Sequence, residues 1–451
     1  MEENMFSQID FGPIREYLDN DDITDISYDN GGQIHLKTLS KGIYRIENPE
    51  INNQLMEKLA FQCANTMGTT FNMAHPMLDA ESAELRLNFI HESIAKNGIA
   101  CVIRKTPAKI RLEKDKLIEQ KYVDIDIHDF LIKCVHGHCN IIVCGETGSG
   151  KTEFVKYLAA HTKDDEKVIT IEDTLELHLD KIFPHRDIVA LKTNNIASYS
   201  DILVACMRQN PKWILLSEVR SAEAVLAVRN SISSGHYILS TIHADKAASI
   251  PNRMYSLMET NQDIEQFLKS IYRYIQIGVY IRGFQNKQTH HFDREIAEVT
   301  EFYVTDDNEA KYNVLYKKST TGKVERHKPS QYLIDYLDGQ GITLDGNEIL
   351  EDEELVKKLN NEELMNFKNN SSDVKTTENV TTNAVAQQVK PIVVNQVQQP
   401  VNQQPVNQIV NPMFSQPVNT QSVQQNVGVT TNQVQNNVPN QVKPNLNGTN
   451  V

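Results

Sequence analysis

The chain has 451 residues and a formal net charge of −14, with 45 Lys and Arg against 59 Asp and Glu. At roughly 150 residues per domain, this length predicts about three structural units with large buried cores. An acidic chain of this kind is not expected to present a basic surface to nucleic acid. The six cysteines are scattered, the first residues are acidic where a secretory signal is basic, and no apolar run reaches the roughly 18 residues of a membrane span. We therefore expect a cytoplasmic protein with reduced thiols.

Residues 1–104 combine short strand-like segments with one helical pattern. Residues 34–36 and 99–104 have the composition of strands, and apolar residues within 54–67 recur at helical spacing. This combination predicts a smaller α+β N-terminal domain. Residues 105–124 are dense in charge and contain a proline, which is typical of a linker.

From residue 125 onward, strand-like apolar runs alternate with helical patterns. The expected strands cover 140–144, 168–171, 213–216 and 237–242, and the expected helices cover 154–160, 202–207 and 222–232. This alternation predicts a three-layer α/β domain with a largely parallel central sheet over residues 125–300. Residues 301–369 form a C-terminal extension of unknown role, in which strands from about 295 to 315 precede a mostly helical stretch from 332 to 367.

The composition changes sharply near residue 370. Residues 371–451 contain 15 Asn, 15 Gln and a single aromatic residue, Phe414. Such a segment cannot bury enough apolar surface to offset the entropy of ordering it, so residues 370–451 are predicted to be a disordered tail. The tail carries a charge of +1, so the acidic charge belongs to the folded part.

A phosphate-binding loop is predicted directly after the strand near residue 144. Residues 145–152 read Gly-Glu-Thr-Gly-Ser-Gly-Lys-Thr, which satisfies the G-x-x-x-x-G-K-[ST] pattern between a strand and an amphipathic helix. Backbone N–H groups of such a loop bind phosphates, and the next helix points its positive end at the same anions. We expect Lys151 to contact the β- and γ-phosphates of ATP and Thr152 to ligate Mg²⁺. The predicted nucleotide-binding residues are Gly145, Glu146, Thr147, Gly148, Ser149, Gly150, Lys151 and Thr152.

Two acidic residues end strand-like runs downstream of this loop. Glu172 follows Val168-Ile169-Thr170-Ile171, and Glu218 follows Trp213-Ile214-Leu215-Leu216-Ser217. Since the carboxyl ends of parallel strands face the ligand crevice, both acids can approach a bound nucleotide. Glu172 is the preferred residue to orient or deprotonate the attacking water, and Glu218 has the position of a Walker B acid that supports Mg²⁺, partly through water. The division of roles between these two acids stays open at the level of sequence.

Histidines mark a third feature. His236 precedes the run 237–242 and His243 follows it, so a histidine at the strand end can sense a γ-phosphate by hydrogen bonding. The run Cys134-Val-His136-Gly-His138-Cys139 looks like a metal cluster, but six consecutive residues before the loop's strand would have to wrap tightly around one ion. An ordinary helix-to-strand turn with apolar thiols is preferred to a zinc site.

Taken together, these segments resemble the type II/IV secretion ATPase family. The resemblance rests on the P-loop, the acidic box 171–177, the Walker B segment 216–220 and the histidine box 236–244, which occur in that order. An Arg-x-x-Pro element at 208–211 precedes Walker B, and the segments that contain Arg86 and Arg104 resemble the end of the family's N-terminal domain.

The resemblance implies a RecA-like P-loop NTPase domain in a hexameric ring. It implies that Glu172 is the catalytic glutamate, that Glu218 is the Walker B acid, and that His236 and His243 sense the γ-phosphate. It also implies that Arg86 and Arg104 reach the nucleotide from the N-terminal domain. Arg208 and Arg220 are the remaining sensor or arginine candidates.

The function expected from this family is ATP hydrolysis that powers type IV secretion, conjugative transfer or pilus assembly at the cytoplasmic face of the membrane. Its partners would be copies of the same chain and inner-membrane secretion or pilus proteins, with no direct contact to nucleic acid. The absence of a C-x-x-C…C-x-x-C quartet favours the type IV secretion and tight-adherence branches. Two alternatives are a nucleic-acid motor, such as a helicase or packaging ATPase, and a non-hydrolysing scaffold that uses nucleotide only as an assembly switch. The acidic charge opposes the first, and the intact P-loop and strand-end acids oppose the second.

Overall fold

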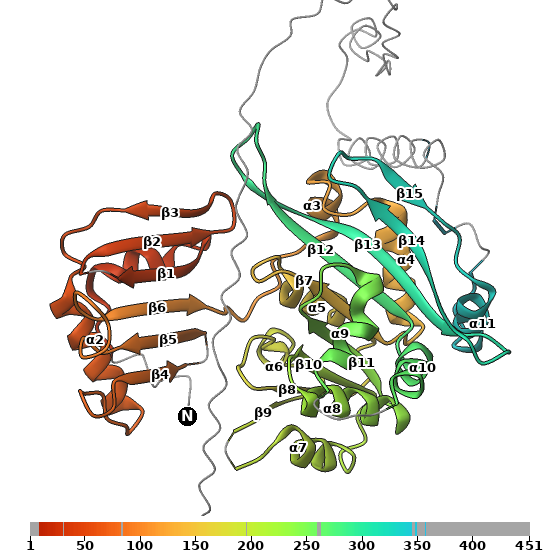
Figure 1. Cartoon of the computed structure of the whole chain (residues 1–451), viewed down its shortest axis with the longest axis horizontal. Helices are drawn as coiled ribbons and strands as arrows, with labels where there is room; N and C mark the ends of the chain where they lie inside the picture. The colour runs from red at the N-terminus through yellow and green to blue at the C-terminus, as the bar shows by residue number, and fades with distance from the viewer. Residues whose placement is uncertain are drawn as a thin grey trace, which may run out of the picture. The chain divides into compact units, whose positions relative to one another are not determined.

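The computed structural model describes residues 9–29, 31–82, 84–194, 196–258, 263–344, 348–349 and 357. The predicted tail at 370–451 and most of the helical stretch expected up to 367 lie outside these described residues. The described elements form an N-terminal antiparallel sheet and a larger mixed sheet, each with its own core (Figure 1).

The N-terminal sheet has six strands in the order β3-β2-β1-β6-β5-β4. Its strands are β1 (Ile23–Asp29), β2 (Gln33–Thr38), β3 (Gly42–Ile46), β4 (Met77–Glu81), β5 (Leu85–Ile90) and β6 (Ala100–Lys105), and every neighbouring pair is antiparallel. Helices α1 (Arg15–Asp19) and α2 (Asn53–Thr66) accompany the sheet, and the Asn52 side chain caps α2 by accepting from the Leu55 N–H at 3.1 Å. The strands expected at 34–36 and 99–104 and the helix expected at 54–67 are confirmed.

The larger sheet has nine strands in the order β15-β14-β13-β12-β7-β11-β10-β8-β9. Its parallel part consists of β7 (Ile141–Gly145), β8 (Val168–Glu172), β9 (Ile188–Lys192), β10 (Trp213–Val219), β11 (Tyr237–Ile242) and β12 (Ile277–Gln285). The predicted largely parallel sheet is therefore confirmed.

Alternate residues of the parallel strands pack against helices on opposite faces. Ile141, Val143 and Leu215 belong to the core on one face, and Ile142, Cys144 and Leu216 to the core on the other. A strand buried on both faces reads as a continuous apolar run, which is why these segments do not alternate with polar residues. The helices of the first face are α4 (Ile125–His136), α5 (Lys151–Ala159), α6 (Leu179–Ile182) and α11 (Gln331–Gly339). Those of the second face are α7 (Tyr199–Cys206), α8 (Ala222–Ser233), α9 (Ile250–Ser256) and α10 (Ile264–Tyr274).

An antiparallel extension continues this sheet beyond β12. It consists of β13 (Phe292–Val304), β14 (Ala310–Lys318) and β15 (Val324–Arg326), each antiparallel to its neighbour. The boundary expected between residues 300 and 301 therefore falls inside β13. Hydrogen bonding from β12 to β13 and on to β14 carries the sheet through this point, so the extension shares the core of the preceding strands.

The segment expected to be a plain linker is partly helical and well packed. Helix α3 (Lys114–Glu119) lies within it, and Leu117 and Tyr122 are buried in the core of the larger sheet. The C-terminal end of this segment is bonded to the antiparallel extension, because the Ile296 N–H of β13 donates to the Tyr122 carbonyl at 2.7 Å.

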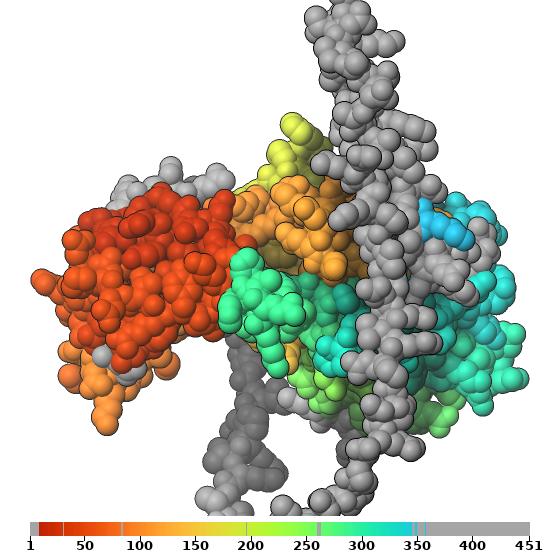
Figure 2. Space-filling view, turned by 90° about the horizontal axis from the view of Figure 1, so that it is seen from above, coloured from red at the N-terminus to blue at the C-terminus, as the bar shows by residue number. Residues whose placement is uncertain are grey.

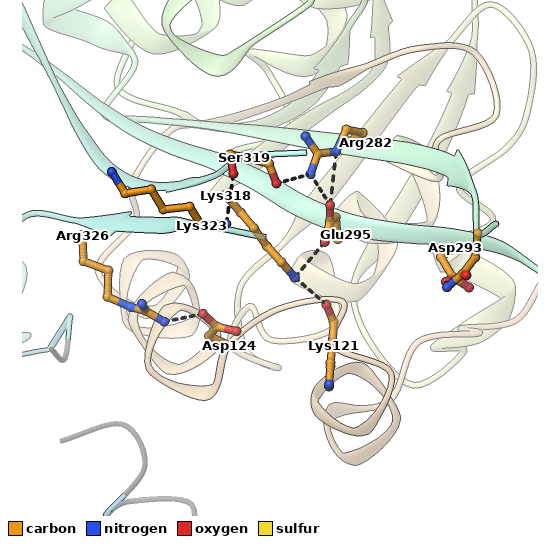
Figure 3. Close-up of polar contacts among 10 residues, drawn as sticks. Lys121, Asp124, Arg282, Asp293, Glu295, Lys318, Ser319, Lys323 and Arg326 are labelled. Carbon is orange, nitrogen blue, oxygen red and sulfur yellow. Dashed lines mark hydrogen bonds and ion pairs between the residues drawn. The ribbon is translucent and has the colours of Figure 1, made fainter. Parts of the chain in front are cut away.

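Polar contacts fasten the end of the linker to β14 and β15 (Figure 3). Lys318 Nζ lies 2.7 Å from Glu295 Oε2 and donates to the Lys121 carbonyl at 3.4 Å. Arg326 pairs with Asp124, which directly precedes α4, and lies 3.4 Å from Asp126 Oδ2. The linker therefore ends in a fixed position relative to the sheet.

All six cysteines are buried, and none of them forms a disulfide. Cys134 and Cys139 belong to the hydrophobic core, and His138 Nε2 lies 2.7 Å from Glu166 Oε1. Among the helices that the structure describes, none is both long and apolar enough to cross a membrane.

Candidate functional site

The predicted phosphate loop connects β7 to α5. Gly148 and Gly150 adopt φ values of +81° and +92°, which L side chains rarely adopt, so the loop needs glycine at these turns. Lys151, 7% exposed, donates from Nζ to the carbonyl oxygens of Gly145 at 3.1 Å and Glu146 at 3.0 Å. Burial lowers the pKa of this ammonium group, against the opposing effect of the Glu218 carboxylate.

His243 and Glu218 meet Lys151 at the carboxyl ends of the strands. His243 Nε2 lies 2.8 Å from Glu218 Oε1, and His243 Nδ1 lies 3.1 Å from the Gly145 carbonyl oxygen and 3.4 Å from Lys151 Nζ. The structure therefore brings together three residues that the sequence predicted for this site, from α5, β10 and the end of β11.

Glu172 and Glu176 occupy different environments in the acidic box. Glu172 is 0% exposed, and its Oε2 accepts from the backbone N–H groups of Glu176 at 2.9 Å and Leu177 at 3.0 Å. Burial raises the pKa of Glu172 to about 7. Glu176 instead lines the pocket beside the P-loop, where its Oε2 accepts from the Thr152 hydroxyl at 3.1 Å.

Glu176 is the functional candidate that our reading of the sequence missed. It lies inside the acidic box that we identified, four residues after Glu172, so the available signal was a second glutamate in the same motif. The direction of a side chain just past a strand end depends on the loop that follows, and periodicity does not determine it.

His236 and Arg208 lie at the other end of the parallel strands. His236 precedes β11, with Nδ1 3.0 Å from the Pro211 carbonyl oxygen and Nε2 3.1 Å from Met207 Sδ. Arg208 is exposed just after α7 and before β10. Within one chain, a full strand length separates these residues from the P-loop, so this geometry does not support His236 as a sensor of that chain's own γ-phosphate.

Of the other predicted arginines, Arg104 lines the pocket, whereas Arg86 and Arg220 contact the acidic box. Arg104 on β6 lines the same pocket as the P-loop and donates to Asp25 Oδ1 at 2.8 Å. Although burial opposes it, the Asp25 carboxylate raises the pKa of Arg104, with Glu176 and Glu218 acting in the same direction. Arg86 on β5 contacts the acidic box, donating to the Thr174 hydroxyl at 3.0 Å, and Arg220 pairs with Asp173.

A cavity of about 580 Å³ joins these elements, which is a suitable volume for a small ligand. Seven basic and five acidic side chains line it, although the whole chain is strongly acidic. Its walls come from the N-terminal sheet, the linker, the P-loop and the β12–β13 hairpin. In Figure 2 the green tip of this hairpin lies against the red N-terminal sheet, and the Phe292 N–H donates to the Ser40 carbonyl at 2.8 Å. The excess of positive charge favours an anionic ligand.

The strand–loop–helix unit, the strand order and the buried lysine define a P-loop nucleotide-binding domain. The family model described as "Type II/IV secretion system protein" matches residues 7–292. The chain belongs to this family.

The relatives of this chain include an uncharacterized protein and proteins that carry the VirB11 name. An uncharacterized protein of Bacillus anthracis is 28% identical over 286 residues, covering 63% of this chain and 64% of that protein. Protein VirB11 of Rhizobium radiobacter is 34% identical over 164 residues, covering 35% of this chain and 46% of that protein. The matched region thus spans about half to two thirds of the length of these relatives.

A solved structure shows the same fold. The ATPase DotB of Yersinia pseudotuberculosis superposes with a TM-score of 0.50 at 15% sequence identity, covering 65% of this chain and 78% of that chain. The VirB11 ATPase of the Brucella suis type IV secretion system, solved with sulphate, is 24% identical with a TM-score of 0.35, covering 64% of this chain and 91% of that chain.

Proposed function

We propose that this protein is an ATPase that hydrolyses ATP at the P-loop site and uses the energy to drive type IV secretion, conjugative transfer or pilus assembly. The observation that carries the proposal is the convergence of Lys151, His243, Glu218 and Glu176 on one loop beside a positively charged cavity. Names of relatives such as VirB11 support the secretion role. A nucleic-acid motor is not favoured, because the chain as a whole is strongly acidic, whereas seven of its basic residues line the cavity beside the P-loop.

Each residue of the site has a proposed task. Backbone N–H groups of the P-loop bind the phosphates, and the Lys151 ammonium moves from the loop carbonyls to the β- and γ-phosphates. His243 is placed to hydrogen-bond the γ-phosphate next to Lys151. Glu218, whose Oε1 lies 2.8 Å from His243 Nε2, would hold the His243 ring in that orientation.

Glu176 is our proposed residue for orienting or deprotonating the attacking water. It lies on the pocket wall against Thr152, whereas the buried Glu172 is occupied with two backbone N–H groups. Those two bonds shape the turn that carries Glu176, so we propose that Glu172 is a positioning residue. This replaces the sequence-based hypothesis that Glu172 acts on the water.

The site also fits Mg²⁺, which prefers oxygen ligands. The Thr152 hydroxyl and the carboxylates of Glu176 and Glu218 are the oxygen donors that would hold the ion, directly or through water. When bound, Mg²⁺ would neutralise charge on the phosphates. The contribution of the chain is to fix these donors at the ends of three different elements.

The family resemblance supports a ring of copies, most simply a hexamer, that works with inner-membrane secretion or pilus proteins at the cytoplasmic face. In such a ring, Arg104 would face the developing negative charge from the N-terminal domain, and closing that domain on the P-loop would couple hydrolysis to movement. Arg86 would act indirectly, through Thr174 of the acidic box.

Replacing the P-loop lysine tests this function. Lys151→Ala should reduce steady-state phosphate release to below about a tenth of the wild-type rate, because the ammonium is placed within the P-loop to reach the β- and γ-phosphates. Lys163→Ala, in the loop after α5, is the matched control and should keep wild-type turnover. If Lys151→Ala retains most of the activity, this loop is not the catalytic site.

A further inference from the structure

Arg294, on β13, lies directly over the P-loop. Its Nε donates to the Gly148 carbonyl at 3.4 Å, and its Nη1 donates to the Leu39 carbonyl of the N-terminal sheet at 3.2 Å. A Cβ built on Gly150 would lie 3.4 Å from Arg294 Cδ. The side chain thus contacts Gly148 and leaves little room for a side chain at Gly150 in the phosphate-binding turn.

The strand and its neighbours hold this arginine in place. Successive residues of a strand point to opposite faces, so Asp293 and Glu295 share the face opposite Arg294. Glu295 is anchored there by Arg282 and by Lys318 (Figure 3). On the Arg294 side, the guanidinium lies over the Phe292 ring, 4.8 Å from its centroid. The position of the arginine is therefore fixed before any ligand binds.

The charge of Arg294 is not neutralised by a direct ion pair. Arg104 and Lys156, which line the same cavity, are paired with Asp25 and Glu153. The described residues place no carboxylate within 4.0 Å of the Arg294 guanidinium, whose two hydrogen bonds both go to neutral carbonyl oxygens. Burial lowers the pKa of Arg294, yet arginine stays protonated at neutral pH. A cation that has no ion-pair partner and lies in a half-buried cavity favours the binding of an anion there.

We propose that Arg294 is a nucleotide-binding arginine, supplied by the antiparallel extension of the same chain, that contacts the polyphosphate held by the P-loop. The guanidinium has five N–H donors, of which two are used by backbone carbonyls. Arg294 lines the same cavity as Gly148 and Gly150 of the P-loop, so a polyphosphate bound by the N–H groups of that loop would lie within reach of the remaining donors. Arg294 lies outside the residues that the family model matches, 7–292, so the proposal concerns a part of this chain that the family comparison does not cover.

The proposal rests on the proposed ATPase function, and it predicts a penalty that depends on the number of phosphates. Arg294→Ala should weaken binding of ATP and inorganic triphosphate by on the order of tenfold to a hundredfold. Adenosine and AMP should lose much less affinity, because they offer little or no phosphate charge. The affinity of the variant for ATP should also fall less steeply with added salt than that of the wild type.

The experiment measures dissociation constants of the full chain for triphosphate, ATP, ADP, AMP and adenosine by calorimetry, with melting temperatures of every variant. Arg294→Gln keeps much of the side-chain volume without the charge and should resemble Arg294→Ala, while Arg294→Lys should be intermediate. Lys317→Ala removes an exposed cation from β14 outside the cavity and should bind every ligand as the wild type does.

Two results would overturn the proposal. If Arg294→Ala and Arg294→Gln weaken all five ligands equally and lower the melting temperature, the arginine only braces the loop against the N-terminal sheet. If both variants bind all ligands with wild-type affinity, Arg294 does not contact the nucleotide. Failure of the ATPase assignment is separate, because it would appear as Lys151→Ala retaining both ATP binding and turnover.

Discussion

At the scale of single residues, burial separates two glutamates that the sequence places in one motif. Glu172 accepts two backbone N–H bonds in a fully buried position, and Glu176 reaches the Thr152 hydroxyl from the pocket wall. A water-activating group must reach the water, and geometry decides this before pKa does. The same reasoning distinguishes His243, beside Lys151, from His236 at the far end of β11.

The two glutamates should respond differently to conversion into amides. Glu176→Gln should slow single-turnover hydrolysis by about a hundredfold or more while ATP affinity stays within a few-fold of the wild-type value, because an amide cannot act as a base. Glu172→Gln should slow single-turnover hydrolysis much less, since the amide oxygen can still accept from the backbone N–H groups of residues 176 and 177. The reverse order of effects would return the role to Glu172.

A stability measurement provides the control for Glu172. Its pKa is raised to about 7 in the folded protein, so folding favours the protonated form. The stabilising contribution is present below the ordinary pKa of a glutamate and is lost as pH rises through 7, by on the order of 3 kcal/mol. Gln does not titrate, so the melting temperature of Glu172→Gln relative to wild type should increase from pH 5 to pH 8. A difference that is constant with pH would contradict this account.

At the scale of elements, the extension β13–β15 fastens the linker and forms part of the cavity. Arg326, with a side chain 9% exposed, joins β15 to Asp124 and to Asp126, whose side chain is 0% exposed. Removing one member of a buried pair leaves the other charge without compensation in a low-dielectric interior, which costs far more than losing a surface pair. The linker is therefore held by the sheet that follows it in the chain.

Replacing Arg326 should show this effect. We expect Arg326→Ala to lower the free energy of unfolding by about 3–5 kcal/mol, measured by urea denaturation. Lys323→Ala breaks the exposed pair with Glu325 on the same hairpin and should cost less than about 1 kcal/mol. Equal losses in the two variants would mean that the buried contact does not stabilise the linker.

At the scale of the whole molecule, the cavity beside the P-loop draws on three regions. The P-loop lies in the parallel sheet, Arg104 and Lys37 come from the N-terminal sheet, and Arg294 comes from the extension. A site assembled from separate elements responds to their movement, which is what conversion of hydrolysis into mechanical work requires.

Activity should therefore depend on the N-terminal arginine and on assembly. Arg104→Ala should lower kcat by about tenfold or more with a smaller change in ATP affinity, because the arginine would act on charge that develops during hydrolysis. Arg45→Ala, which removes an exposed arginine from the same sheet, should have no effect. Mass photometry with nucleotide should show a hexamer whose activity per chain exceeds that of the monomer. A fully active monomer, or an unaffected Arg104→Ala, would exclude this ring mechanism.

The sequence alone determined the P-loop, the order of the motifs, the parallel sheet and most of its strands. These features are local, because the period of apolar residues and the glycine pattern of residues 145–152 follow from backbone geometry at each segment. The helix α3 inside the linker was missed, since a charge-dense segment with a proline resembles a loop until Leu117 and Tyr122 are seen in the core.

Only the tertiary structure decided which acid faces Thr152, which histidine meets Lys151, and that Arg294 lines the cavity beside the P-loop. Each of these contacts joins residues far apart in the chain or depends on how a loop turns after a strand ends. Such contacts depend on how one element packs against another, and this packing cannot be predicted from the periodicity of residues along the sequence.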